Sequence, residues 1–516
     1  MKNCFSLSIL ASLIFLLYGC SGISSDPFDK LSVEWKLYSN SPDQGGTCHT
    51  AFVFHNRGNK EFTNSDWMLY FNQMGAMPRK NVPAQTASVE HLGGDFYRLV
   101  PSAGFSIPPA DSLVVHCYMR GWVLKKTDTP TGLYFTVHQG DKEKILRVKD
   151  FSIAEFPHPD SLNPFRGLIT MPDAGSIFKE NASINQSIIH EGKVCIVPTP
   201  IQQKQLDGDL EISATTNIYY RKGLENEASY LSTQVEKITG VRIGKTEGNK
   251  PGPKSIILRI GNVQLEENSP EAYHLTVSSS EGVAVEGNTA TGVFYGVQTL
   301  LRLIPLNAMQ HRVTTFRISA TEITDAPRFA YRGLHFDVAR NFSNKETILK
   351  LIDLLAFYKL NTLHLHLTDD EGWRIEIPAL PELTTIGSKR AHTLTDANWL
   401  HPSYGSGPYA DPVSSRGTGY YSTREFIEIL RYATERHIVV IPEINFPGHA
   451  RAAIKAMEAR YKKLMSQNQP EKAEEFRLID PADSSVYLSA QAYNDNVVCV
   501  VRESVYRFYE IVVKAL

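Results

Sequence analysis

Residues Asn361–Trp373 read N-T-L-H-L-H-L-T-D-D-E-G-W and decide the fold of the C-terminal part of the chain. Strict alternation places His364, His366 and Thr368 on one side of a strand and leucines on the other. A helical pattern at Lys345–Tyr358 comes before this strand, which favours a parallel sheet with helical crossovers. Carboxylates at the C-terminal end of such a strand lie where α/β folds build active sites. The stretch therefore predicts an enzyme site.

The C-terminal region, residues 328–516, alternates strands and helices around this stretch. The region begins with strand-like Tyr331–Val338. A long loop follows the stretch that ends at Trp373. After this loop we expect a helix at Ser422–Arg436, a strand at His437–Ile444 and a last helix at Asp495–Leu516. This order makes about three βα units, whereas a (β/α)8 TIM barrel has eight. We therefore expect the first part of a TIM barrel.

Two further regions precede it. Residues 28–165 carry short alternating runs separated by Gly, Asn, Pro and Asp, which is typical of a β-sandwich. Residues 197–324 mix strand-like and helical runs, which predicts a small α+β domain, and the proline-rich stretch Phe156–Pro172 separates the two. A length of 516 residues also indicates a multidomain protein.

The predicted β-sandwich is rich in aromatic residues, which suits stacking on sugars. Aromatic side chains are also common in the core of a sandwich. Both interpretations stay open for Trp35, Trp67, Tyr70, Phe71, Tyr97 and Trp122.

The N-terminus is a targeting segment. A short polar start and an apolar run at Phe5–Tyr18 predict a signal peptide over residues 1–19. The letters L-Y-G-C at residues 17–20 resemble a bacterial lipobox, which implies cleavage before Cys20 and its lipidation. We expect an exported lipoprotein, held by acyl chains on a membrane of a Gram-negative bacterium, in the outer membrane or periplasm. A plain secretory signal is the alternative.

Charge and cysteine content exclude some classes of partner. A net charge of −2 argues against a nucleic-acid partner held by bulk electrostatics. Cys48 and Cys117 lie in the same predicted β domain and could form a disulfide in an exported protein; buried free thiols are the alternative. No cysteine has the spacing of a metal ligand.

Three strand ends carry the candidate chemistry. In order along the chain they read Y-R-G-L-H-F-D-V-A-R (331–340), L-H-L-T-D-D-E-G-W-R (365–374) and P-E-I-N-F-P-G-H-A-R-A-A (442–453). This ordered set resembles glycoside hydrolase family 20, the β-N-acetylhexosaminidases, and its chitobiase-like branch in particular. The resemblance extends to residues 28–165, similar to that branch's carbohydrate-binding-like β domain, and to residues 197–324, similar to its small α+β domain.

The resemblance implies release of terminal non-reducing N-acetylhexosamine from β-linked glycans by a retaining, substrate-assisted mechanism on a (β/α)8 barrel. In the family, an Asp-Glu pair in an H-x-G-G-D-E motif after the fourth strand orients the acetamido group and supplies the acid/base. That motif is not in this sequence. We expect the chain to be truncated before the pair and to be inactive alone.

The supporting residues match position by position. Arg340 matches an arginine that binds sugar hydroxyls, although a buried pair with a neighbouring aspartate is the alternative. Asp369 matches an aspartate of the site network, and His449 a histidine beside the acid/base. Asn445 departs from the family's usual aspartate, so His449 would lose an orienting anion, which Glu443 or Asp369 could replace.

In the stretch Asn361–Trp373, His364 and His366 are interpreted as packing residues. Of its three carboxylates, only Asp369 is expected to have a role in the site. Asp370 and Glu371 are disfavoured as an acid pair because neighbours on a strand point opposite ways. The stretch His91–Phe96 (H-L-G-G-D-F) resembles the start of the catalytic motif but has phenylalanine in place of its glutamate, and is interpreted as a hairpin turn.

Two other functions are compatible with parts of the sequence. His364-x-His366 could ligate zinc in a metal-dependent hydrolase, but the carboxylates and arginine suit sugar better, so we expect neither a metal nor a cofactor. A non-catalytic, glycan-binding surface lipoprotein is the second alternative. The expected partners are an N-acetylhexosamine-containing glycan and a membrane, with no nucleic acid.

Overall fold

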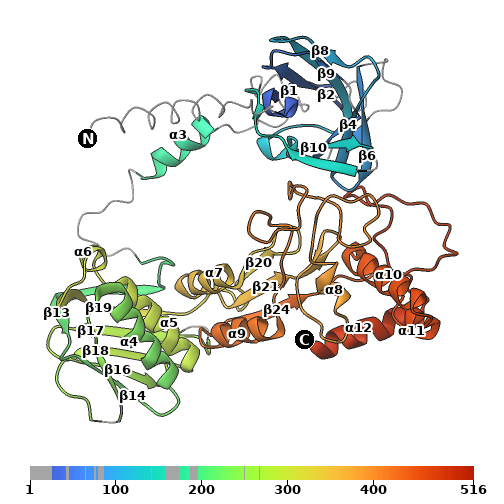
Figure 1. The fold of residues 1–516 in the computed structure, drawn as a ribbon. Helices are drawn as coiled ribbons and strands as arrows, with labels where there is room; N and C mark the ends of the chain where they lie inside the picture. Colours follow the sequence, from blue (N-terminus) through green and yellow to red (C-terminus); the bar gives the residue numbers. More distant parts are fainter. Residues whose placement is uncertain are drawn as a thin grey trace, which may run out of the picture. The chain divides into compact units, whose positions relative to one another are not determined.

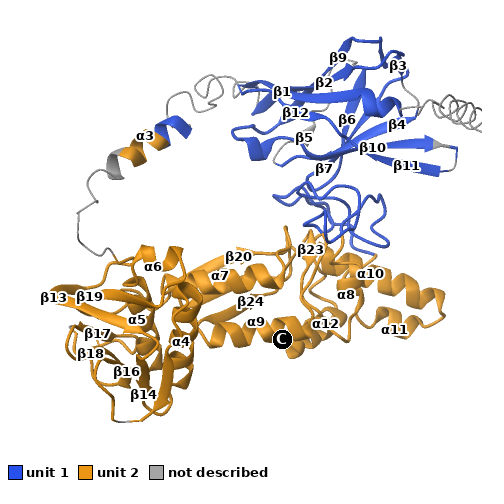
Figure 2. Cartoon of the chain, turned by 60° about the vertical axis from the view of Figure 1, so that its left-hand side comes forward, with its two compact units in different colours: residues 1–177, 390–417, 482–495 blue, residues 178–389, 418–481, 496–516 orange. Residues whose placement is uncertain are grey.

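The computed structural model describes residues 26–41, 46–63, 66–74, 77–78, 86–140, 142–156, 174–185, 196–248, 250–265 and 268–516. The predicted signal peptide, Cys20 and Cys195 lie outside these residues. The chain divides into two compact units, 1–177 with 390–417 and 482–495, and 178–389 with 418–481 and 496–516 (Figure 2). Within the described residues, no helix combines the length and apolarity that a membrane crossing requires.

The first unit contains two five-stranded sheets with a shared apolar core (Figure 1). The first sheet has the order β12-β1-β2-β9-β5 and the second β11-β10-β4-β7-β6. Their bounds are β1 (Leu31–Ser41), β2 (Thr47–Asn56), β4 (Trp67–Asn72), β5 (Met77–Pro78), β6 (Ala87–Gly93), β7 (Phe96–Pro101), β9 (Ser112–Arg120), β10 (Thr131–Gln139), β11 (Lys142–Arg147) and β12 (Phe151–Ile153). A short pair, β3 (Phe62–Thr63) and β8 (Ser106–Ile107), adds to the edge.

Most aromatic residues of this unit form its core. Five of the six named above are at most 1% exposed: Trp35, Trp67, Tyr70, Phe71 and Tyr97. A row of partly exposed rings instead crosses the other face of the first sheet, where His49 stacks on Tyr38 at 4.8 Å and on Tyr118 at 4.5 Å between ring centroids. Burial removes these five residues from sugar stacking.

Cys48 and Cys117 are buried free thiols. Cys48 lies opposite Met119 and Cys117 opposite Thr50, so the two cysteines are diagonal neighbours on β2 and β9. Diagonal positions are about 7–8 Å apart, longer than the usual Cα separation across a disulfide. Burial raises the pKa of Cys48 to about 11 and that of Cys117 to about 12, so both stay protonated at neutral pH.

The His91–Phe96 stretch is a β-hairpin turn, as interpreted from its Gly-Gly-Asp sequence. β6 and β7 pair antiparallel across it, and Gly94 has φ +57°. The buried Asp95 carboxylate accepts from Ser403 Oγ at 2.6 Å and from the Tyr404 backbone N–H at 2.7 Å. This carboxylate anchors residues 390–417 on the second sheet and has no catalytic neighbour of the kind that the motif would require.

A seven-stranded mixed sheet with the order β13-β19-β17-β18-β16-β14-β15 forms the α+β part of the second unit. Its strands are β13 (Gln202–Ser213), β14 (Asn217–Tyr220), β15 (Gly244–Glu247), β16 (Ser255–Ile260), β17 (Tyr273–Ser278), β18 (Gly282–Gly287) and β19 (Thr315–Asp325). The helices are α4 (Glu225–Thr239), α5 (Ala290–Arg302) and α6 (Leu306–Gln310). Gly296 lets α5 approach the sheet closely, because a Cβ there would collide with Val285.

Three parallel strands form the framework of the C-terminal region: β20 (Gly333–Asp337), β21 (Thr362–His366) and β24 (Val439–Glu443). A two-residue hairpin, β22 (Thr368–Asp369) and β23 (Gly372–Trp373), follows β21. The helices are α7 (Lys345–Phe357), α8 (Glu382–Thr385), α9 (Thr423–Thr434), α10 (Arg451–Ser466), α11 (Pro470–Glu474) and α12 (Glu503–Ala515).

Two expectations for this region were wrong in detail. The last helix begins at Glu503 rather than Asp495, because the preceding stretch contains four valines, which disfavour a helix. The expected order of elements also omits α10, which directly follows the strand-end motif of β24.

Candidate active site

The site lies where the three parallel strands end. Asp337, His366 and Glu443 are register partners, so their side chains occupy one level on one face of the sheet. Leu363 and Leu365 point the other way and are fully buried. The alternation of β21 thus separates an apolar face from a polar one.

Arg340 is positioned by the turn that ends β20. Asp337 Oδ1 accepts from the backbone N–H of Ala339 at 2.9 Å and of Arg340 at 3.1 Å, which closes the turn. The guanidinium then pairs with Asp337 at 2.8 Å, Asp369 at 2.7 Å and Glu371 at 3.4 Å. Burial opposes the charge, but these carboxylates raise the pKa of Arg340 above its ordinary value.

The structure thus shows the ion-pair alternative for Arg340. A guanidinium has five donors, and 21% of this side chain is exposed. Ion pairing and sugar contact are therefore compatible.

Asp369 is the centre of the network and is 1% exposed. Its Oδ2 atom lies 2.7 Å from Arg340 Nη2 and 2.7 Å from His366 Nε2. Its Oδ1 atom accepts from the Asp370 backbone N–H at 2.7 Å and lies 3.0 Å from His449 Nδ1. Burial would raise the pKa of this carboxyl, but the hydrogen bond from His366 and the charge of Arg340 lower it, so Asp369 is ionised.

Asp369 provides the orienting anion of His449. Asn445 does not: its side-chain amide donates to Thr368 O at 2.9 Å and to Asp369 Oδ2 at 3.3 Å. His449 has φ +55° and a 42% exposed side chain, so its other ring nitrogen is available at the strand-end edge of the site. We call this edge, with Arg340, Asp369 and His449, the rim. Of the two anions considered in place of the family's usual aspartate, the structure selects Asp369.

Glu443 instead belongs to a histidine cluster below the rim. Its carboxylate lies 2.7 Å from His364 Nε2, 2.9 Å from His366 Nδ1 and 3.3 Å from His335 Nε2. Burial would raise the pKa of Glu443, but His366 and the other histidines lower it. The pKa of His366 is raised despite burial, because Asp369 and Glu443 flank its ring.

The prediction that the strand histidines serve only packing is therefore wrong. His364 contacts the Glu443 carboxylate of β24, and His366 lies between Asp337 of β20 and Glu443 of β24. The sequence carried only part of this signal, because the acidic residues at 337 and 443 come beside His366 only once strand order and register are known.

Asp370 points away from Arg340, as alternation predicts. Its carboxylate accepts from the Arg451 backbone N–H at 3.2 Å, at the start of α10, and from Asn496 Nδ2 at 2.9 Å. Burial and then the charge of Asp369 raise the pKa of Asp370 to about 6. Glu371 contacts Arg340, so Asp370 and Glu371 do not form an acid pair.

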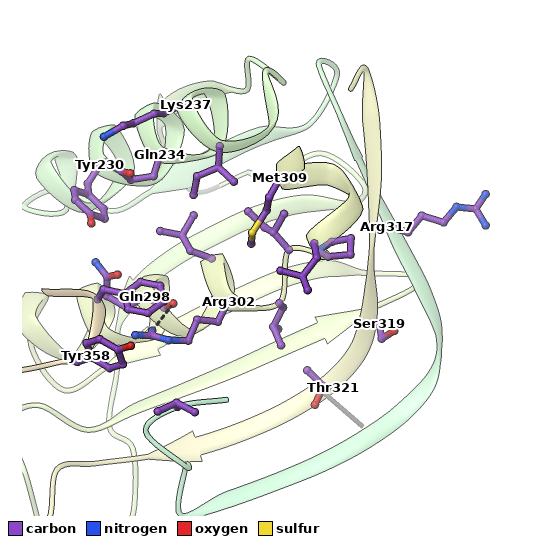
Figure 3. A pocket seen from close by; sticks show the side chains of 18 of the residues that line it. Tyr230, Gln234, Lys237, Gln298, Arg302, Met309, Arg317, Ser319, Thr321 and Tyr358 are labelled. Atoms are coloured by element: carbon purple, nitrogen blue, oxygen red, sulfur yellow. Dashed lines mark hydrogen bonds between the residues drawn. The ribbon is translucent and has the colours of Figure 1, made fainter. Parts of the chain in front are cut away.

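A separate cavity of about 830 Å³ lies between the α+β part of the second unit and α7 (Figure 3). Gln298, Arg302 and Tyr358 project into it, and the Arg302 guanidinium lies 4.0 Å above the Phe357 ring. Burial lowers the pKa of Arg302 to about 10. Asp353 is the only carboxylate among its described lining residues, so this cavity lacks the pair of carboxylates that most glycoside hydrolases use.

Family comparisons cover most of the chain. Residues 329–516 match the glycosyl hydrolase family 20 catalytic domain, and residues 193–326 match domain 2 of the same family. Residues 30–166 match a putative carbohydrate binding domain. The two family 20 matches together span more than half of the chain.

Individual relatives agree with the family matches. Beta-hexosaminidase B of Pseudoalteromonas piscicida is 32% identical over 93% of this chain and 61% of the relative. N,N'-diacetylchitobiase of Vibrio harveyi is 31% identical over 94% of this chain and 55% of the relative. The chain therefore spans little more than half the length of these relatives.

A solved structure has a similar fold over the same extent. The GH20 exo β-N-acetylglucosaminidase from Vibrio harveyi, in complex with N-acetylglucosamine, superposes with a TM-score of 0.72 and 25% identity, covering 94% of this chain and 65% of that one. The three strand ends, the family matches and this fold agree: the chain belongs to glycosyl hydrolase family 20.

Proposed function

We propose that the protein releases terminal non-reducing N-acetylhexosamine from β-linked glycans of the chitobiose type. The observation that carries this proposal is the Arg340–Asp369–His449 constellation, in which one buried carboxylate holds a guanidinium at 2.7 Å and an imidazole at 3.0 Å. The names of the relatives, β-hexosaminidase and diacetylchitobiase, support the same substrate class. Residues 328–516 are then the first part of a (β/α)8 barrel.

Each member of the constellation has a task in this chemistry. Arg340 presents donors to sugar hydroxyls, and Asp369 fixes its direction. Asp369 also holds His449 through Nδ1, which directs Nε2 toward the rim, where a neighbouring acid would exchange its proton. In the substrate-assisted scheme, the acetamido oxygen of the substrate attacks the anomeric carbon, and the bond to the leaving sugar breaks with protonation by a general acid.

We further propose that this acid/base is not supplied by residues 1–516. Glu371 and Glu443 are the glutamates of the strand-end motifs, and each is engaged, with Arg340 and with three histidines respectively. Purified residues 1–516 should therefore leave a chromogenic N-acetylglucosaminide uncleaved. Turnover above an Arg340→Ala control would contradict this placement of the acid.

Sugar binding tests the constellation independently of turnover. Saturation-transfer NMR with N-acetylglucosamine should give a signal that Arg340→Lys weakens, because lysine lacks the two-pronged geometry of arginine. Arg242→Lys, at an exposed arginine paired with Glu236, is the matched control and should leave the signal unchanged. Equal signals from all three proteins would refute the assignment of Arg340.

A non-catalytic glycan-binding protein is the competing function. The partly exposed row of Tyr38, His49 and Tyr118 on the β-sandwich favours it, because stacked rings suit sugar faces. Tyr38→Ala separates the two proposals: loss of binding there, with Arg340→Lys silent, favours the competitor.

We also propose that the protein is exported and anchored through Cys20, which rests on the L-Y-G-C sequence at residues 17–20. In a Gram-negative host, metabolic labelling with a palmitate analogue should mark the wild type and not Cys20→Ala. Release of an unlabelled wild-type protein into the soluble fraction would contradict the anchor.

A further inference from the structure

We propose that His335, His366 and Glu443 form a binding site for a divalent transition metal of the Zn²⁺ class, below the sugar-binding rim. The ligand atoms of these three residues all lie within 4.8 Å of one another. Two imidazoles and one carboxylate are a donor set that zinc accepts, with a fourth position left for water. The inference stands apart from the proposed hydrolysis, because metal binding requires no turnover.

A buried ring nitrogen in poor hydrogen-bond geometry points to this site. His366 is 6% exposed, and its Nδ1 atom contacts the Glu443 carboxylate without meeting hydrogen-bond geometry. Nδ1 lies 2.9 Å from Glu443 Oε1, close enough for both atoms to face one ion. A buried ring nitrogen without a hydrogen bond is costly, and coordination would satisfy it.

The surrounding groups resemble the outer shell of a metal site. Metal-bound histidine usually donates its second N–H to a carboxylate, and His366 Nε2 lies 2.7 Å from Asp369 Oδ2. The carboxylate ligand is also held, since His364 Nε2 lies 2.7 Å from Glu443 Oε2. Both outer partners come from the β21 strand or directly after it, so they fix the ligands before an ion arrives.

Local charge favours a cation. The Arg340 guanidinium lies 3.3 Å from His366 Nε2, and it is already matched by the carboxylates of Asp337, Asp369 and Glu371. Glu443 adds another negative charge, and among the described residues its ion pairs are with three imidazoles. Carboxylates therefore outnumber permanent cations here, and a divalent ion would offset the excess.

Sequence spacing suggests a different pair of ligands, His364 and His366, and the carboxylates beside them argue against metal. In the structure His364 orients Glu443, and the second imidazole comes from His335 on β20, 5.5 Å from His366 between ring centroids. The proposed ligands are therefore His335, His366 and Glu443, and His364 belongs to the outer shell.

The test uses tag-free residues 1–516, stripped with a chelator and titrated with Co²⁺. Bound Co²⁺ should give visible d–d absorption with one ion per chain, and Zn²⁺ should displace it. His335→Ala and Glu443→Gln should each weaken Co²⁺ binding at least tenfold, and Asp369→Asn should weaken it about 10–100-fold through the outer shell. His335 is half-exposed, so its removal leaves the core intact, which circular dichroism would check.

His274→Ala is the matched control, because His274 also faces a glutamate, Glu322 at 3.4 Å, outside the cluster. It should bind Co²⁺ as the wild type does. The proposal is overturned if the wild type gives no d–d absorption in molar excess of Co²⁺. It is also overturned if His335→Ala and Glu443→Gln bind as tightly as the wild type.

Discussion

Replacing Asp369 by asparagine should destabilise the rim, because no orientation of the amide satisfies its neighbours. The Oδ2 atom faces three nitrogens, those of Arg340 and His366 at 2.7 Å and that of Asn445 at 3.3 Å. An amide NH₂ in this place would confront the donors of Arg340 and Asn445, and only His366 Nε2 could accept from it, after a change of tautomer. In the place of Oδ1 it would confront the Asp370 backbone N–H, although His449 Nδ1 could accept from it after a change of tautomer.

The second orientation costs less, and its magnitude can be estimated. It loses the backbone hydrogen bond to a charged acceptor, worth about 1.5–3 kcal/mol, and leaves that donor buried. Arg340 keeps Asp337 and Glu371, so it is not left unpaired, and the total stays near the lower end of the 3–5 kcal/mol typical of a broken buried pair. We expect a loss of about 3 kcal/mol.

Hydrogen exchange measured by mass spectrometry suits this estimate, because it reports local opening in a multidomain chain. Peptides covering Thr362–Trp373 should exchange faster in Asp369→Asn, and ¹⁵N NMR should show the changed tautomer of His449. Asp483→Asn, at an exposed aspartate bonded to Ser485, is the control and should change opening by less than about 0.5 kcal/mol. Local opening of Asp369→Asn within that margin would refute the reasoning.

Three more changes test other parts of the network. Lys359→Met leaves the buried Asp325 carboxylate without the cation that contacts it at 2.9 Å. Hydrogen exchange should show that the opening free energy of β17 and β19 falls by about 3–5 kcal/mol. The double variant K359M/D325L should recover part of this loss. Gly94→Ala adds a Cβ at φ +57° that collides with the Tyr493 ring, so residues 482–495 should become sensitive to protease; an unchanged digestion pattern would contradict the packing. Because the pKa of Asp370 is raised to about 6, the folded state holds an extra proton between pH 4 and 6. The free energy of unfolding therefore falls by at most about 3 kcal/mol as the pH rises through that window. Asp370→Asn should therefore gain in Tm relative to the wild type from pH 4 to pH 7, and a constant difference would exclude this role.

Local pattern predicted the regular elements of this chain well. The helix expected at Lys345–Tyr358 is α7 (Lys345–Phe357), where Asn344 caps the first turn through Thr347 N–H. The helical runs expected within residues 197–324 are α4 and α5, and the Gly-Gly-Asp hairpin is confirmed by the pairing of β6 and β7. These features depend on side-chain periodicity, caps and turns, which lie within a few residues of sequence.

Features that depend on distant packing were not predictable in the same way. Burial of Asp95 by Ser403 and Tyr404 joins segments about 300 positions apart. No local signal distinguishes that aspartate from an exposed turn residue. The aromatic residues of the sandwich show the same limit, since the sequence alone could not separate core rings such as Trp67 from exposed rings such as Tyr38.

The roles of the side chains on the polar face of β21 depend on its neighbouring strands, which the sequence of β21 alone does not show. Alternation assigns side chains to faces but says nothing of what lies across from them, and a histidine facing apolar neighbours is only a packing residue. Once β20 and β24 lie on either side in parallel register, the same histidine has Asp337 on one side and Glu443 on the other. Its ring then bridges the rim carboxylate Asp369 and the deeper Glu443 at 2.7 and 2.9 Å. The role of His366 is therefore set by strand order, and a substitution such as His366→Leu, apolar and compatible with packing, should disturb Asp369 far more than a packing role would allow.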